Sequence, residues 1–114
     1  MKPFFSILIP VYNQVGLMDG CIASIQKQSF KDLEVIFVDD GSRDNTVQKV
    51  KALIDKDKNV HLLSFSRNFG KEAAIYAGLE KSKGDYVVFM DADLQDPPSL
   101  LPEMFKYIDG RDSR

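Results

Sequence analysis

The sequence is poor in the residues that build disulfide frameworks and zinc sites. Its 114 residues include one cysteine, one histidine and no tryptophan. One cysteine cannot form a disulfide within the chain, and one cysteine with one histidine cannot supply the four ligands of a usual zinc site. Any metal that this chain binds is therefore expected to be held by oxygen atoms. The single cysteine also suits a reducing compartment, and we expect a cytoplasmic location.

An excess of one charge and a long hydrophobic run are also missing. Fifteen basic and seventeen acidic residues give a net charge of −2, which excludes nucleic-acid binding through bulk positive charge. The apolar run at residues 4–11 is far shorter than the roughly 18–20 residues of a membrane-spanning helix. It reads as a buried strand rather than a signal peptide. The sequence leaves open whether the full-length protein lies at the cytoplasmic face of a membrane.

Two glycine-rich nucleotide motifs are absent as well. No Gly-x-Gly-x-x-Gly follows the first apolar run, and no Gly-x-x-x-x-Gly-Lys-Ser/Thr occurs anywhere in the chain. The standard dinucleotide-binding and P-loop interpretations therefore lose their main support.

What the sequence does contain is the pattern of a small α/β protein. Hydrophobic residues make up 44% and charged residues 28%, which is typical of a globular domain. Four short, continuous apolar runs occupy residues 4–11, 33–38, 60–65 and 86–90. Runs of this kind are typical of strands that are buried on both faces.

Helical patterns separate and follow these runs. Helices are expected over residues 17–25, over residues 47–54, from residue 73 to a stop at Gly84, and over residues 99–108. The alternation predicts a Rossmann-like α/β fold, with a parallel sheet of about four strands and helices on both faces. We expect one domain over residues 1–108 and a polar tail over residues 109–114.

Polar residues follow each of the four predicted strands. They form the clusters at residues 10–13, 39–42, 66–71 and 91–95. Because the carboxyl ends of parallel strands meet at one edge of a sheet, these clusters are expected to lie together, and ligands of open α/β sheets bind at that edge. The sequence therefore predicts a ligand site there.

Asp91 and Asp93 are the candidate metal ligands and catalytic residues. Two carboxylates spaced i, i+2 on an extended chain point the same way and create a negative field that a cation would offset. Mg²⁺ or Mn²⁺ prefers such oxygen ligands and commonly bridges to substrate phosphates. Gln95 could add a neutral carbonyl oxygen. The alternative is that one of the aspartates merely caps a turn.

Asp39 and Asp40 are the candidate readers of a nucleobase. A carboxylate can accept an N–H from a base, while Gly41 lets the backbone come close. Asp39 is the preferred reader and Asp40 the reserve. Because Asp, Gly and Ser are turn residues, a turn without any ligand contact is the alternative for one of the two aspartates.

Arg67 and Lys71 are the candidate phosphate ligands. They flank Gly70, and cations near a glycine turn suit an anionic pyrophosphate. Two solvated surface charges, or a pair between Lys71 and Glu72, are the alternatives. Tyr12 either stacks on a base or packs at the rim of the core.

Together these motifs resemble a known family. The segments at residues 6–13, 38–42, 66–71 and 91–98 read SILIPVYN, VDDGS, SRNFGK and DADLQDPP. In this order they are similar to the family-two inverting glycosyltransferases with the GT-A fold. The last two segments are most similar to the subgroup that charges a polyprenyl or dolichyl phosphate with one sugar.

The resemblance implies a role for each motif. Pro10 and Tyr12 would line the base pocket, and Asp39 or Asp40 would read the base. Arg67 would contact the nucleotide. Asp91 and Asp93, with help from Gln95, would bind Mg²⁺ or Mn²⁺ on the donor pyrophosphate. The partners implied are a nucleotide-diphosphate sugar donor and a lipid-phosphate or saccharide acceptor. No nucleic-acid partner is implied.

The resemblance also implies a limit. The GT-A domain of the family is longer than this chain, so the chain is expected to be its N-terminal, nucleotide-binding half, with little or no turnover alone. Such a half would expose apolar sheet, which leaves self-association open. A non-catalytic nucleotide-sugar binding module is one alternative function. A signalling receiver domain is another, but it needs an acidic pair after the first strand, where this chain has residues 10–13 instead.

Overall fold

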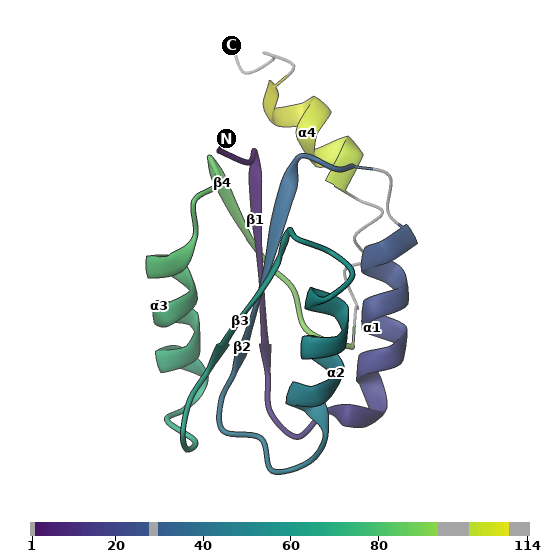
Figure 1. Cartoon of the computed structure of the whole chain (residues 1–114). Coiled ribbons are helices and arrows are strands. Elements are labelled where there is room, and N and C mark those ends of the chain that lie inside the picture. Colours follow the sequence, from purple (N-terminus) through teal and green to yellow (C-terminus); the bar gives the residue numbers. More distant parts are fainter. Residues whose placement is uncertain (1, 28–29, 94–100, 110–114) are drawn as a thin grey trace.

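The structure is a computed structural model that describes residues 2–27, 30–93 and 101–109 (Figure 1). Its strands are β1 (Phe5–Val11), β2 (Leu33–Asp39), β3 (Val60–Ser64) and β4 (Tyr86–Phe89), and its helices are α1 (Val15–Lys27), α2 (Thr46–Ile54), α3 (Lys71–Lys81) and α4 (Leu101–Asp109). The predicted alternation of strands and helices is confirmed. The last helix begins two residues after its predicted start and ends one residue after its predicted end.

The four strands form one parallel sheet in the order β3-β2-β1-β4. β1 lies at its centre, with Phe5 opposite both Leu33 of β2 and Tyr86 of β4. The chain therefore winds outward from β1 to β3 and then returns to place β4 on the other side of β1. All carboxyl ends point to one edge, at the bottom of Figure 1.

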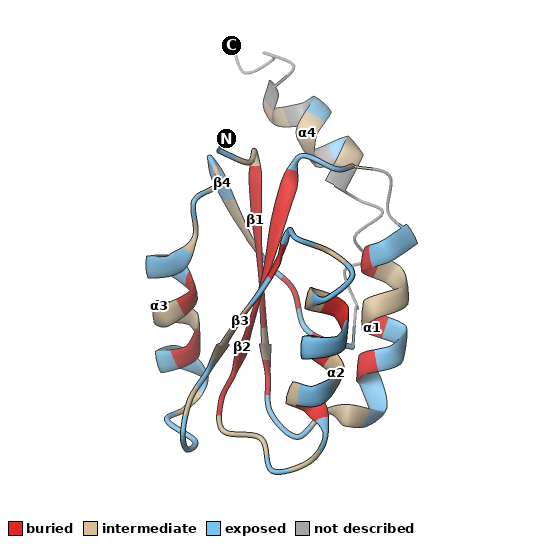
Figure 2. Cartoon of the chain, in the orientation of Figure 1, coloured by how far each residue is buried: buried red, intermediate tan, exposed pale blue. Residues whose placement is uncertain are grey.

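Helices cover both faces of the sheet, as predicted. α1 and α2 lie on one face and α3 on the other (Figure 1). Successive residues of β1 point to opposite faces, so Ile7 and Ile9 join the larger core beneath α1 and α2, while Leu8 joins the smaller core beneath α3. Figure 2 shows that β1 and β2 are almost entirely buried, which explains their continuous apolar sequences.

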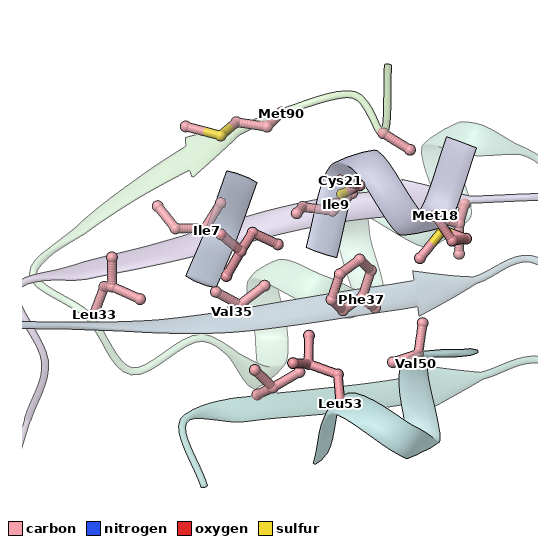
Figure 3. Close-up of a cluster of buried hydrophobic side chains, with 14 of the residues drawn as sticks. Ile7, Ile9, Met18, Cys21, Leu33, Val35, Phe37, Val50, Leu53 and Met90 are labelled. Carbon is pink, nitrogen blue, oxygen red and sulfur yellow. The ribbon is translucent and has the colours of Figure 1, made fainter. Parts of the chain in front are cut away.

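The larger core holds the one cysteine of the chain. Cys21 of α1 points toward the sheet beside Ile9 (Figure 3). Burial raises the pKa of its thiol to about 11, because the apolar surroundings disfavour the thiolate. Cys21 is therefore a core residue with an inert thiol.

α4 packs at the opposite edge of the sheet from the carboxyl ends. Its Phe105 ring lies 4.7 Å from that of Phe4 and 5.0 Å from that of Phe30, between ring centroids. Pro102 falls in the first turn of α4, where a missing N–H costs no helical bond. No helix among residues 2–27, 30–93 and 101–109 is long and apolar enough to cross a membrane.

The outer edge of the sheet carries exposed aromatic side chains. Tyr86 and Phe89 of β4 are both exposed, and β4 is a terminal strand of the sheet. An apolar strand edge of this kind is a surface for pairing. Self-association through it stays a prediction.

The turn into β4 is held by close backbone contact. Gly84 N donates to Ser6 Oγ at 2.7 Å, and Ser6 Oγ donates to the buried Glu34 carboxylate at 2.6 Å. A Cβ at position 84 would lie 2.6 Å from Ser6 N. α3 ends at Lys81, three residues before Gly84, so the prediction that Gly84 stops the helix is wrong. Gly84 is needed instead for the close approach to β1.

Gly84→Ala is expected to lower the free energy of unfolding by about 2–3 kcal/mol, because the added methyl group would push β4 away from β1. Gly20→Ala is the matched control, since a Cβ at position 20 of α1 would meet nothing within 4 Å. That change should stabilise the helix by roughly 0.5–1 kcal/mol. Urea unfolding measures both variants, and equal stability of the two would contradict the proposed role of Gly84.

Candidate functional site

A cavity opens where the strand order reverses, between the carboxyl ends of β1 and β4. Its volume is about 250 Å³, and we call it the β1–β4 cavity. The residues that line it are Pro10, Val11, Tyr12, Gln14, Asp40, Lys71, Ala74 and Asp91. Ligands of open α/β sheets bind at such reversal points, and this cavity lies at the edge that the sequence predicts.

The cavity exists because β1 is longer than β4. The last pair between them joins Leu8 to Phe89, and one further bond runs from Met90 N to Leu8 O. Since Leu8 turns its carbonyl toward β4, Pro10 faces the same side, beyond the end of β4. Proline has no N–H to offer a neighbour, so it fits this unpaired position.

A second cavity lies on the other side of Tyr12, over β2 and β3. Its volume is about 410 Å³, and we call it the β2–β3 cavity. Its lining includes Asp39, Ser42 and Arg67. Tyr12 is exposed and lines both cavities, so the structure divides the predicted site residues between two neighbouring spaces.

Asp39 and Asp40 are both buried and fall in different cavities. The Asp39 carboxylate accepts Ser42 N at 3.1 Å, which forms the turn considered as its alternative role. The Asp40 carboxylate accepts the backbone N–H groups of Phe69 at 2.7 Å and Gly70 at 3.0 Å. Asp40, the reserve reader, shares the β1–β4 cavity with Asp91, whereas Asp39 does not line that cavity.

Gly41 brings two loops into contact. Its φ is +86°, and a Cβ at this position would lie 2.4 Å from the carbonyl carbon of Arg67. The close approach made by Gly41 is therefore to the backbone after β3, where the sequence suggested an approach to a ligand. No other residue type would fit both the conformation and the space.

Arg67 and Lys71 also fall in different cavities. The Arg67 guanidinium lies over the Phe69 ring, 4.8 Å from its centroid, and lines the β2–β3 cavity. Lys71 Nζ lies 3.6 Å from Asp91 Oδ1 in the β1–β4 cavity. Lys71 therefore pairs with Asp91, and the ion pair with Glu72 is not found among the described side chains.

Asp91 and Asp93 do not share one cavity. Both are exposed, but the chain leaves the sheet after Met90 and turns at residues 92–93 around the buried Ala92. Asp91 lines the β1–β4 cavity, while Asp93 lines a separate hollow against the glycine-rich start of α1. The extended geometry expected for the pair is replaced by a turn. Gln95 lies outside the described residues.

The carboxylate oxygens of Asp91 fit Mg²⁺ or Mn²⁺ as part of a site that water and substrate phosphates complete. Within the part of the chain that the structure describes, no group of three or more His, Cys, Asp or Glu side chains forms a cage for an ion. Mg²⁺ rarely needs one, because it keeps several waters and is often bound by one or two carboxylates plus substrate phosphates. Exposed carboxylates beside an open cavity suit a metal that arrives with a phosphorylated ligand.

The loop after β1 is held by residues that the sequence did not single out for the site. Asn13 N donates to Ser42 Oγ at 2.8 Å, and Arg43 N donates to Asn13 Oδ1 at 2.8 Å. Asn13 adopts a φ of +50°, a conformation that asparagine tolerates better than most residues. These contacts fix Tyr12 between the two cavities, and an asparagine next to a strand end was their only signal in the sequence.

Asp44 joins the starts of two helices. Its carboxylate accepts Thr46 N at 2.9 Å at the start of α2 and Val15 N at 3.2 Å at the start of α1. It also accepts the Thr46 hydroxyl. Asp44 thus supplies the side-chain contacts at the start of α2, whereas the N-cap residue Asn45 makes no side-chain cap hydrogen bond.

Comparison with known proteins identifies the family. The family description "Glycosyl transferase family 2" matches residues 6–113. The chain belongs to glycosyl transferase family 2. Since this family consists of sugar-transferring enzymes built on a GT-A-like fold, the receiver-domain alternative loses its support.

Among curated relatives of this family 2 chain, CsbB of Bacillus subtilis (strain 168), provisionally named as a glycosyltransferase, is 48% identical over 112 residues. The undecaprenyl-phosphate 4-deoxy-4-formamido-L-arabinose transferase of Pseudomonas fluorescens (strain SBW25) is 41% identical over 112 residues. These matches cover 94% and 91% of this chain but 34% and 33% of the relatives. The chain thus spans about a third of the length of the curated relatives it matches.

Solved structures of glycosyltransferases share the fold of this chain. The mannosyltransferase PcManGT from Pyrobaculum calidifontis, in complex with GDP-Man and Mn²⁺, matches with a TM-score of 0.83 and 26% identity, over 95% of this chain and 33% of that one. S. aureus TarS 1-349 in complex with UDP-GlcNAc matches with a TM-score of 0.83 and 29% identity, over 94% of this chain and 31% of that one. The Rossmann-like α/β fold of the family 2 chain is confirmed.

Asp44 is expected to make the stability of the fold depend on pH. Its hydrogen bonds with Thr46 lower the pKa of its carboxyl below the ordinary value of 3.8. A carboxyl with a lowered pKa in the folded state stabilises the fold above its unfolded pKa, and this stabilisation disappears as the pH falls through the folded pKa. Asp44→Asn should therefore reduce the free energy of unfolding more at pH 6 than at pH 3. Urea unfolding at the two pH values measures this, and an equal loss at both would contradict it.

Proposed function

We propose that this chain binds a nucleotide-diphosphate sugar in the β1–β4 cavity, as the donor-binding part of an inverting glycosyltransferase. One observation carries the proposal. An exposed carboxylate (Asp91), a lysine (Lys71) and an exposed aromatic ring (Tyr12) line one cavity at the point where the strand order reverses. This combination suits a ligand with a base to stack, a diphosphate to neutralise and a metal to bridge.

The base is assigned to the part of the cavity lined by Pro10 and Tyr12. Of the two candidate readers, Asp40 is favoured because it lines the same cavity as Asp91. Its two oxygens already accept backbone N–H groups, but each carboxylate oxygen has a second acceptor position. Asp39 stays the alternative, since it opens into the β2–β3 cavity together with Arg67.

The diphosphate is assigned to Asp91, Asp93 and the two cations. Asp91 would hold Mg²⁺ or Mn²⁺ in the β1–β4 cavity. Asp93, which lines the separate hollow at the start of α1, would have to turn toward Asp91 to share the ion, and Gln95 would be a further ligand outside the described residues. Mn²⁺ and GDP-Man in the complex of the P. calidifontis relative support this assignment. A bound divalent ion offsets the charge that builds up on a leaving nucleoside diphosphate. Lys71 and Arg67 would add positive charge on either side of Tyr12.

The acceptor proposed is a lipid phosphate, with a saccharide as the alternative. Relatives named as undecaprenyl-phosphate and bactoprenol sugar transferases support the lipid. An acceptor oxygen would attack the anomeric carbon from the face opposite the leaving group. A new C–O bond forms, and the nucleoside diphosphate leaves with the electrons of the broken bond. A phosphate acceptor is already ionised and needs little help from a base.

Turnover is proposed for a protein of the length of the relatives, because this chain spans about a third of them. A lipid-phosphate acceptor would place such a protein at the cytoplasmic face of a membrane. Donor binding is the part of the function that the present chain can be tested for.

Calorimetric titration with UDP and with GDP, each with and without Mn²⁺, tests the proposal. Binding is expected to depend on the metal. Asp91→Asn and Asp93→Asn should each weaken it by about tenfold or more, because each removes a charged ligand of the ion. Asp19→Asn is the matched control, since Asp19 pairs with Lys49 and lines neither cavity. Binding of equal strength in Asp91→Asn and the parent would refute the metal assignment.

Arg67→Ala tests the role of the second cation. If Arg67 contacts phosphate, the loss of charge-assisted hydrogen bonds should weaken UDP or GDP binding by roughly tenfold. Binding of the bare nucleoside should change much less. Competition titrations with nucleoside and nucleoside diphosphate measure the two effects, and an equal loss for both would remove Arg67 from the phosphate role.

A further inference from the structure

Lys71 and Asp91 form an ion pair inside the cavity proposed for the donor. Lys71 is the first residue of α3 and Asp91 follows β4, so the pair joins the start of a helix to the end of the strand that comes next in the chain. Lys71 Nζ lies 3.6 Å from Asp91 Oδ1, and the side chains are 66% and 59% exposed. Both are therefore open to ions and ligands from solution.

The position of Lys71 in its helix does not favour a lysine. The start of a helix carries a partial positive charge, which disfavours a cation there. Gly70, which precedes it, has no side chain to cap the helix. Among the described side chains, Asp91 forms the ion pair with Lys71, whereas Asp40, the other carboxylate of the cavity, accepts the backbone N–H groups of Phe69 and Gly70 at the start of α3.

A divalent ion at Asp91 and the ammonium group of Lys71 compete for the same carboxylate. Two cations at one carboxylate repel each other, so an ion that binds there must displace the lysine or bind more weakly. A displaced lysine has four flexible carbon atoms between its backbone and its charge, and can turn to a nearby anion. A diphosphate bound beside the metal is such an anion.

We propose that Lys71 occupies the Asp91 carboxylate until a metal and a nucleoside diphosphate arrive together, and then moves to the diphosphate. This rests on the proposed function, because it assumes that Asp91 is a metal ligand. Lys71 thereby weakens the binding of the metal ion on its own, and it couples metal binding to nucleotide binding. By linkage the coupling is reciprocal, so the metal must strengthen nucleotide binding by the same factor.

Titration of Mn²⁺ followed by electron paramagnetic resonance tests this without any enzymatic activity. Free Mn²⁺ is measured against the whole 114-residue chain, with and without UDP or GDP. Lys71→Met is expected to bind Mn²⁺ alone about two- to fivefold more tightly than the parent, the range expected for loss of one exposed competing charge. The factor by which the nucleotide strengthens Mn²⁺ binding should fall in the same variant.

Two variants separate the ion pair from general charge effects. Lys71→Arg keeps a cation beside Asp91 and should behave like the parent. Lys49→Met removes a lysine from another exposed pair, in which Lys49 Nζ lies 2.9 Å from Asp19 Oδ1. That change should leave both the Mn²⁺ affinity and the coupling factor unchanged. Circular dichroism confirms that each variant is folded.

The outcomes distinguish failure of this proposal from failure of the proposed function. If Lys71→Met binds Mn²⁺ no more tightly and keeps the coupling factor, while Asp91→Asn loses Mn²⁺ in the presence of nucleotide, Lys71 is not the competitor and the metal site stands. If Lys49→Met tightens Mn²⁺ binding as much as Lys71→Met, bulk charge explains the effect and the proposal is wrong. If Asp91→Asn binds Mn²⁺ like the parent with nucleotide present, the proposed function itself fails.

Discussion

The central position of β1, paired in the same register with β2 and β4, is the constraint on which the rest of the structure depends. Phe5 lies opposite both Leu33 and Tyr86, so all later loops are placed relative to this one strand. Because β1 continues past the end of β4, a space opens beside Pro10 at the carboxyl edge. The site follows from this difference in strand length and from the reversal of strand order, which parallel α/β sheets use to bind ligands.

Acidic residues at this edge divide into two kinds. Asp39, Asp40 and Asp44 accept backbone N–H groups. Asp39 shapes the turn after β2, while Asp40 and Asp44 hold that loop against the segments that follow β3 and β1. Asp91 and Asp93 are exposed beside open spaces. The first kind builds a rigid frame, and the second is accessible to ions from solution. The family to which the chain belongs is consistent with this division, since a transferase must hold its donor in a fixed orientation.

Most of the fold was predictable because each buried strand leaves a continuous apolar run and each helix leaves an apolar stripe. The place of the candidate site was predictable, since strand ends converge by topology alone. Its internal arrangement was not. The i, i+2 spacing of Asp91 and Asp93 suggested one direction for both side chains, but the chain turns around the buried Ala92. Likewise Lys71 pairs with Asp91 across twenty positions of sequence, a contact that only tertiary packing determines.

The burial of Cys21 has a practical consequence for spectroscopy. Its thiol is the only one in the sequence, and its high pKa keeps it from reacting as a thiolate near neutral pH. A cysteine introduced at an exposed rim position would therefore carry a maleimide dye or spin label at one known place, without removal of the native residue. The distance between such a label and a paramagnetic ion could then be measured in an otherwise unaltered core.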